Sequence, residues 1–269
     1  MPSFICTACG TGYPPRETPP HECLICEDER QYVPASGQGW TTLQALTVSR
    51  ANAFRQYEPG VIGIGTQPAF AIGQRALLII TQHGNILWDC ISLIDEATIT
   101  LINSLGGLTA IAISHPHFYT TMGHWSRAFG DVPIHLHADD RDWILQKSDA
   151  ISLWDGETLE ILPEITLVRC GGHFPGANVL HWAGGADGRG IVCSGDTLSV
   201  TTDLNFVTFM RSYPNFLPLS AAEINCIDAA MKPFAYERIY GHYFDRVIAA
   251  DAKDVMERSV RRYLNAIGR

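Results

Sequence analysis

The chain has 269 residues, 46% of them hydrophobic and 17% charged, and a formal net charge of −9. These values are typical of a globular protein with a sizeable core, and an acidic chain without clustered Lys and Arg argues against a nucleic-acid-binding surface. No apolar run approaches the roughly 20 residues that a membrane-spanning helix needs. The first residues lead to Cys6 without the pattern of a signal peptide, so we expect a cytoplasmic protein with reduced thiols.

The first forty residues differ in composition from the rest. They hold four of the eight cysteines, several prolines and few aliphatic side chains. Such a segment cannot bury enough apolar surface to fold alone and needs a cross-link. We therefore expect a cysteine-rich segment, residues 1–40, followed by a main domain, residues 41–269.

The main domain alternates groups of predicted strands with predicted helices. Short apolar runs indicate strands at 61–65, 76–81, 85–89, 109–115, 133–136, 159–161, 165–168, 179–182 and 191–193. Helical spacing and end signals predict helices at 95–105, 121–129, 138–146, 220–231 and 251–267. This order favours a sheet-rich core with helices outside. The later cysteines are interpreted as small core residues: Cys90, Cys170, Cys193 and Cys226.

Two CxxC pairs lie in the cysteine-rich segment. Cys6 and Cys9 are separated from Cys23 and Cys26 by thirteen residues. Two such pairs can surround one ion with four thiolates in the tetrahedral arrangement of a structural zinc site. Iron in a rubredoxin-like site is the alternative, since the ligand set is the same, and disulfides are disfavoured in the cytosol. We predict a structural Zn²⁺ at these cysteines.

Ligand-type side chains follow several predicted strands. His115 and His117 end the strand at 109–115, and residues two apart in a strand point to the same side, so we expect their imidazoles to converge. Three later segments each add one such residue after an apolar run: His173 in Gly-Gly-His-Phe-Pro-Gly, Asp196 in Ser-Gly-Asp-Thr, and His242 in Tyr-Gly-His. Together these residues predict a metal site.

These motifs, in this order, resemble those of the metallo-β-lactamase superfamily over roughly residues 60–269, and the cysteine-rich head resembles a rubredoxin-like or zinc-ribbon knuckle. The resemblance implies an α+β fold, an αββα sandwich with metals at one edge between two sheets. It assigns His115, His117 and His173 to the first metal. It also assigns Asp196 to the bridging position and His242 to the second metal.

Two further features follow from the resemblance. Asp89 resembles an early aspartate that orients a ligand histidine in the family. The family's remaining Asp and His fall on Tyr119 and Thr120, which are poor ligands at neutral pH. We therefore expect one tightly bound ion, on the three imidazoles with Asp196 and His242 completing its ligands, and a weak or absent second ion. Zn²⁺ suits this site, with Fe²⁺ or Mn²⁺ as alternatives.

The resulting functional hypothesis is a metal-dependent hydrolase in which activated water attacks a small ester, thioester or lactone, a substrate class implied by the resemblance alone. Asp196 is the expected base, and Tyr119 the expected hydrogen-bond donor to an oxyanion or leaving group. One alternative is a catalytically silent metal-binding scaffold or partner-binding protein of the same fold, and another is an iron-dependent oxidoreductase. We expect a small-molecule substrate and no nucleic-acid or membrane partner; no protein partner is identified.

Overall fold

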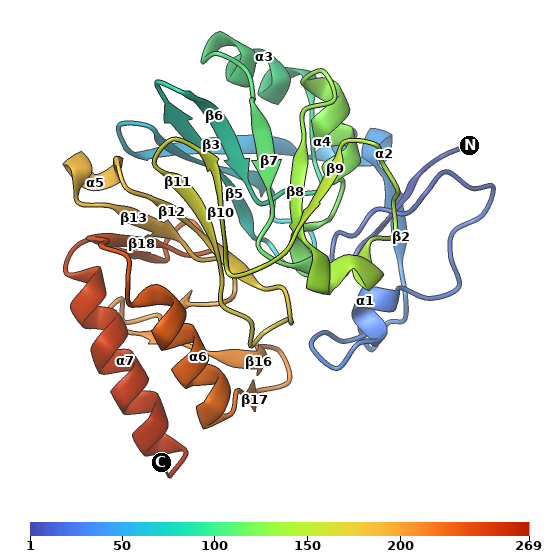
Figure 1. Ribbon diagram of the computed structural model, residues 1–269. Helices are drawn as coiled ribbons and strands as arrows, with labels where there is room; N and C mark the ends of the chain where they lie inside the picture. Colours follow the sequence, from blue (N-terminus) through green and yellow to red (C-terminus); the bar gives the residue numbers. More distant parts are fainter. Residues whose placement is uncertain (269) are drawn as a thin grey trace.

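The computed structural model describes residues 1–268, which form two β-sheets facing each other with helices on both outer faces (Figure 1). The layers follow the order helix, sheet, sheet, helix, so the predicted α+β sandwich is confirmed. None of the helices in residues 1–268 combines the length and the apolar character that crossing a membrane requires.

The first sheet has seven strands in sequence order. They are β3 (Ala51–Glu58), β4 (Val61–Gln67), β5 (Arg75–Thr81), β6 (Gly84–Trp88), β7 (Ala110–Ala112), β8 (Ile134–His137) and β9 (Ile151–Trp154). Neighbours are antiparallel from β3 to β6 and parallel from β6 to β9. The parallel strands need crossovers, and α3 (Glu96–Ser104) and α4 (Met122–Ala128) supply two of them. The side chain of Asp95 caps α3 by accepting from the Thr98 N–H, as predicted for this helix start.

The second sheet has six strands. They are β10 (Thr158–Leu162), β11 (Ile165–Arg169), β12 (Asn178–Trp182), β13 (Ile191–Cys193), β18 (Arg238–Tyr240) and β19 (Val247–Ile248). Its outer face carries α6 (Ala221–Met231), which starts with a capping box of Ser220 and Glu223, and α7 (Ala252–Ala266). β13 and β18 are parallel, so the loops after them leave the sheet at the same edge.

Alternation along the strands creates the three buried layers. In β5, Leu77 and Ile79 face the other sheet, whereas Leu78 packs outward with the residues of α3 and α4. In β13, Ile191 faces the first sheet and Val192 packs under α6 and α7. Period-2 burial on both faces explains why these strands appear in the sequence as nearly continuous apolar runs.

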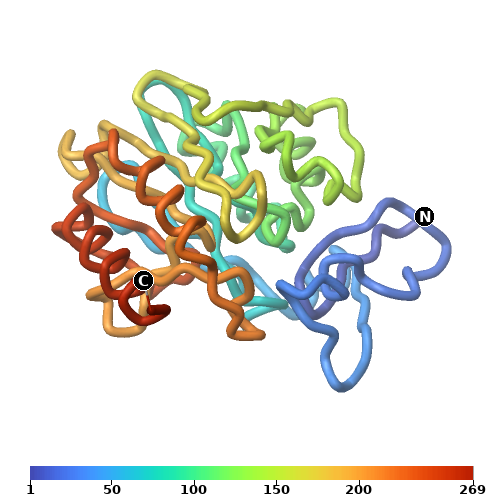
Figure 2. The backbone as a smooth tube through the Cα atoms, turned by 60° about the horizontal axis from the view of Figure 1, so that its bottom comes forward, coloured from blue at the N-terminus to red at the C-terminus, as the bar shows by residue number. Residues whose placement is uncertain are grey.

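The N-terminal segment lies beside the sandwich (Figure 2). It contains β1 (Phe4–Cys6) and the short helix α1 (Leu24–Glu27), and β1 pairs with β2 (Trp40–Thr42), which leads into α2 (Leu43–Ser49). The expected boundary between residues 40 and 41 thus falls inside β2, and the division into 1–40 and 41–269 stays a prediction. The remaining short elements are η1 (Pro116–Phe118), η2 (Ala138–Trp143), α5 (Gly185–Gly188), β14 (Ser199–Val200), β15 (Val207–Thr208), β16 (Met210–Ser212) and β17 (Leu217–Pro218).

Four local points differ from the sequence predictions. The strand expected at 109–115 ends at Ala112, because a turn begins before the histidines, and the helix expected at 138–146 is the shorter 3₁₀ helix η2. Strand β3 was missed because it has few buried side chains and several polar ones. Cys226 is exposed, since α6 buries the face that carries Ile224 and Ile227.

Candidate metal centres

A turn, rather than a continuing strand, brings His115 and His117 together. After β7 the backbone of His115 is extended, and Pro116 then begins the 3₁₀ helix η1, where its fixed φ and missing N–H are tolerated. The two imidazole ring centroids lie 5.0 Å apart with their planes at 75°. The predicted convergence occurs, but the strand alternation invoked for it is wrong.

Two loops of the second sheet complete a group of four donors, which we call the histidine group: His115, His117, His173 and Asp196. His173 comes from the loop between β11 and β12, and Asp196 from the loop after β13. Asp196 Oδ2 lies 3.5 Å from His115 Nε2, 3.9 Å from His117 Nδ1 and 3.7 Å from His173 Nε2. Four side chains from three separate segments of the chain therefore converge on one point.

The spacing of these donors fits a tetrahedral ion. Donors bound at about 2.0–2.1 Å in a tetrahedron are separated by roughly 3.3 Å, and His117 Nδ1 lies 3.3 Å from His173 Nε2. The buried His115 Nε2 has no hydrogen-bond partner among the described residues. A buried imidazole nitrogen without a partner is costly, and a bound cation would satisfy it.

The charge states suit metal ligands. Burial lowers the pKa of His115 to about 4 and that of His173 well below its ordinary value, so both imidazoles are neutral at pH 7. Burial alone would raise the pKa of Asp196, but the neighbouring His242 and His115 outweigh it and hold the pKa well below its usual range. The His173 Nδ1–H donates to the Met210 carbonyl at 3.0 Å, which leaves Nε2 free for an ion.

His242 lies on the opposite side of Asp196. It follows β18, and its Nδ1 is 3.0 Å from Asp196 Oδ1 and 3.1 Å from the Gly195 carbonyl oxygen. The Arg75 N–H donates to the His242 carbonyl at 2.8 Å and fixes this loop. His242 therefore contacts the carboxylate oxygen that faces away from the three imidazoles.

Asp89 acts on the histidine group through Ser114. Its Oδ1 accepts from the Ser114 N–H at 2.8 Å, and the Ser114 Oγ lies 2.9 Å from His115 Nδ1. Burial raises the pKa of Asp89 well above its ordinary value, and the hydrogen bonds from Ser114 offset only part of this rise. The direct contact between Asp89 and a ligand histidine that the resemblance implied is thus replaced by a relay, which no local sequence signal revealed.

Tyr119 is buried and is not part of the histidine group. It packs in the apolar layer under α4 and lines a small cavity with Met122, Trp143 and Gln146. Burial raises the pKa of its phenol well above the ordinary value. The catalytic role of Tyr119 stays a prediction, and its burial in a separate cavity argues against it.

The histidine group opens into a pocket of about 380 Å³, a volume within the usual range for small-molecule sites. Its lining residues come from both sheets and from the N-terminal segment: Ala8, Arg30, Gln31, Tyr32, Ala71, Ile72, His117, His173, Asp196, Tyr213, Pro214, His242 and Tyr243. Sequence reasoning missed Arg30 and Tyr213, since neither belongs to a motif. The N-terminal segment therefore forms one wall of the pocket.

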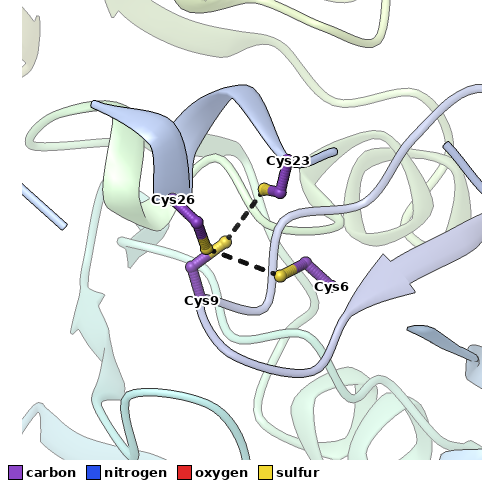
Figure 3. Close-up of side chains that lie close together, drawn as sticks. All are labelled: Cys6, Cys9, Cys23 and Cys26. Carbon is purple, nitrogen blue, oxygen red and sulfur yellow. Dashed lines mark hydrogen bonds between the residues drawn. The ribbon is translucent and has the colours of Figure 1, made fainter. Parts of the chain in front are cut away.

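The four N-terminal cysteines also converge, and we call them the cysteine group (Figure 3). The Sγ atoms of Cys6 and Cys26 are 3.7 Å apart and those of Cys9 and Cys23 are 3.6 Å apart, too far for disulfides. Thiolates bound at about 2.3 Å in a tetrahedron are separated by roughly 3.8 Å. The cysteine group thus has the dimensions of a four-thiolate metal site.

Comparison with known proteins places this geometry in context. No family model matches the chain. The "Uncharacterized protein YmaE" of Bacillus subtilis (strain 168) is 44% identical over 269 residues, which cover 99% of this chain and 97% of YmaE.

Solved structures show the fold. VMB-1 has a TM-score of 0.60 at 12% identity, with 81% of this chain and 98% of VMB-1 covered. A metallo-β-lactamase from Cronobacter sakazakii has a TM-score of 0.52 at 15% identity, covering 80% of this chain and 92% of its own. The metallo-β-lactamase SMB-1 bound to 2-mercaptoethanesulfonate has a TM-score of 0.51 at 12% identity, covering 77% of this chain and 92% of its own.

Proposed function

The chain belongs to the same family as YmaE of Bacillus subtilis and has the metallo-β-lactamase fold, and on this premise we propose that it is a metal-dependent hydrolase of a small ester, thioester or lactone. The observation that carries the proposal is the convergence of three imidazoles and one carboxylate at the floor of a pocket. A donor set that opens into a cavity of substrate size favours an active site over a purely structural metal site.

We assign Zn²⁺ to both groups. The sulfur spacing of the cysteine group favours a structural ion, and the histidine group is proposed to hold a single ion because Tyr119 and Thr120 supply no further ligands. An ion there would supply Lewis acidity, which polarises a carbonyl oxygen and acidifies water.

Asp196 and Tyr243 are the proposed catalytic side chains of this site. The Asp196 carboxylate lies between the imidazoles and His242, and because it is also a proposed ligand with a lowered pKa, its proposed role is to orient the attacking water as a hydrogen-bond acceptor. Tyr243 lines the pocket beside His242, with ring centroids 4.2 Å apart, and its hydroxyl is proposed to donate to the carbonyl or leaving-group oxygen. The hydroxyl of Tyr213 is already committed to backbone carbonyls.

The pocket wall favours a neutral substrate. Ala8, Ala71, Ile72 and Pro214 contribute apolar surface, and the guanidinium of Arg30 is already paired with Asp28 and with the His173 carbonyl. Apart from the ion proposed for the histidine group, a substrate carboxylate would therefore find no free cation among the described lining residues. We propose an uncharged acyl compound as the substrate.

We also propose that the enzyme is cytoplasmic, because its buried cysteines form no disulfides among the described residues.

A metal-reconstitution assay tests the proposal. Protein purified, stripped with chelator and reloaded with Zn²⁺ is assayed on a neutral aryl ester, a thioester, a lactone and an anionic penicillin. We expect hydrolysis of at least one neutral substrate, its loss on stripping and its return on reloading, with the penicillin hydrolysed far more slowly.

A pair of histidine variants controls the assay. His117→Ala is expected to abolish turnover, whereas His135→Ala is expected to retain it, since His135 lies in β8 outside both groups. Loading of the histidine group with Zn²⁺ but no turnover of any neutral substrate would instead favour a metal-binding scaffold.

A further inference from the structure

We propose that Arg30 couples the cysteine group to the histidine group, so that order in the N-terminal segment sets the affinity of the histidine group for its ion. Arg30 is then a positioning residue for His173. The inference rests on the proposed function only in requiring that the histidine group binds a metal ion.

Arg30 is fixed relative to the cysteine group by a local turn. Cys26 lies in α1, which ends at Glu27, and Asp28 follows directly. The Asp28 Oδ1 accepts from the Arg30 backbone N–H at 2.9 Å, and Arg30 Nη1 lies 2.8 and 2.9 Å from the two carboxylate oxygens. The planar guanidinium is thereby oriented by Asp28, which lies two positions after Cys26.

The other side of the same guanidinium holds the loop of His173. Arg30 Nε donates to the His173 carbonyl oxygen at 2.7 Å, and the guanidinium carbon lies 4.3 Å from the ring centroid of Phe174. The Arg30 side chain is only 8% exposed, so these contacts form away from water. Arg30 therefore binds the main chain at His173 and the side chain of the next residue.

The loop of His173 has backbone bonds of its own, from the Gly171 N–H to the Ala177 carbonyl and from the His173 N–H to the Gly171 carbonyl, but these bonds do not reach the imidazole. Gly171 and Gly172 precede it with φ values of +70° and +79°, a conformation that glycine adopts readily but that does not hold a loop in place. The imidazole is fixed by its bond to the Met210 carbonyl, and the peptide by its bond to Arg30. These two contacts set the direction of the Nε2 atom that faces Asp196.

Both contacts lead back to the N-terminal segment. The Ser212 hydroxyl donates to the Arg30 carbonyl at 3.1 Å, and Asn215 Nδ2 donates to the carbonyls of Glu29 and Gln31 at 2.8 and 2.9 Å. The loop after Met210 is thus bound to residues 29–31 as well. In Figure 2 the N-terminal segment (blue) lies beside the sandwich.

The order of residues 28–31 depends in turn on the cysteine group. The apolar cluster of the N-terminal segment consists largely of the four cysteines, with Tyr13 and Ile25. Without an ion, four buried thiols provide little to fix α1, and the turn at Asp28 loses its anchor. Disorder at the cysteine group would then release His173 through Arg30.

Cobalt(II) titration of the metal-stripped protein tests the coupling. Thiolate-bound cobalt has ultraviolet charge-transfer absorption that cobalt bound by imidazole and carboxylate lacks, so the two groups are titrated separately. Arg30→Met is expected to weaken cobalt binding at the histidine group by about tenfold or more, while leaving binding at the cysteine group unchanged. In the same variant, amide hydrogen exchange at residues 171–177 is expected to accelerate.

Arg189→Met is the matched control. Arg189 also donates from Nε to a carbonyl and from Nη1 to a carboxylate, those of Ala186 and Glu237, but it does not line the pocket. We expect wild-type cobalt affinity and exchange in this variant. A folded Arg30→Met protein with wild-type affinity at the histidine group and wild-type exchange at 171–177 would overturn the coupling.

The outcomes separate this inference from the proposed function. If Arg30→Met weakens metal binding as expected but the wild-type protein hydrolyses no neutral substrate, the hydrolase proposal is contradicted and the role of Arg30 stands. Hydrolysis that persists together with unchanged metal affinity in Arg30→Met contradicts the coupling alone.

Discussion

His242 Nδ1 lies 3.0 Å from Asp196 Oδ1, whereas the three imidazoles of the histidine group face the other carboxylate oxygen. Asp196 thus stands between a compact set of ligands and a fourth histidine outside that set. In this arrangement His242 affects the pKa of Asp196 without belonging to the group that would bind the ion.

The first prediction concerns these two residues. Asp196→Ala is expected to lower the affinity of the histidine group for Zn²⁺ by at least about tenfold, because it removes one of four donors. His242→Ala is expected to retain the ion and to lower kcat, since His242 contacts Asp196 through Oδ1, whereas the three imidazoles face Oδ2. Metal content after dialysis against a competing chelator, together with kcat, checks both; equal metal loss in the two variants would make His242 a ligand.

The second prediction concerns the relay from Asp89 to His115. Ser114→Ala removes the hydroxyl 2.9 Å from His115 Nδ1 and is expected to weaken cobalt binding at the histidine group by roughly 10–100-fold. Ser104→Ala, in α3 and exposed, is the control and should bind cobalt normally. Unchanged affinity in Ser114→Ala would show that the ring of His115 is positioned by packing alone.

The third prediction separates two tyrosines. Tyr119→Phe is expected to keep kcat within about twofold of wild type, because Tyr119 lines a different cavity, whereas Tyr243→Phe is expected to lower kcat by roughly tenfold. Steady-state kinetics on a neutral ester measures both effects. A large fall in kcat for a folded Tyr119→Phe protein would restore the role first predicted for that residue.

The fourth prediction concerns pH and stability. Burial raises the pKa of Asp140 to about 7, which the bond from the Gly176 N–H at 2.8 Å only partly offsets. Because the folded state then binds the proton more tightly than the unfolded state, this carboxyl costs no stability below its unfolded pKa and progressively destabilises the fold as pH rises toward 7. The cost above that range is at most about 4 kcal/mol.

Asp140→Asn tests this effect, because the amide oxygen can still accept from Gly176 without becoming charged. The variant is expected to gain stability relative to wild type at pH 8 and to lose that gain near pH 4. Urea unfolding of both proteins across this range gives the difference in free energy. A difference that stays constant with pH would mean that the pKa of Asp140 is the same in the folded and unfolded states.

Much of the architecture was predictable because it follows from local patterns. Strands buried on both faces, such as β5 and β13, appear as apolar runs, and Asp95 marks the start of α3. Strand β3 was missed because its polar residues break the alternation. Cys226 was misplaced because burial on a helix depends on which face meets the sheet.

The sequence by itself determined the candidate ligand types and their order, since imidazoles, thiolates and carboxylates can bind metal ions in any fold. Only the tertiary structure decided which atoms meet. The turn at Pro116 aims His115 and His117, the packing under α4 buries Tyr119, and Arg30 joins an N-terminal turn to His173 across 143 residues. Contacts over such separations depend on how the sheets, loops and N-terminal segment are packed, and no spacing of residues along the chain encodes them.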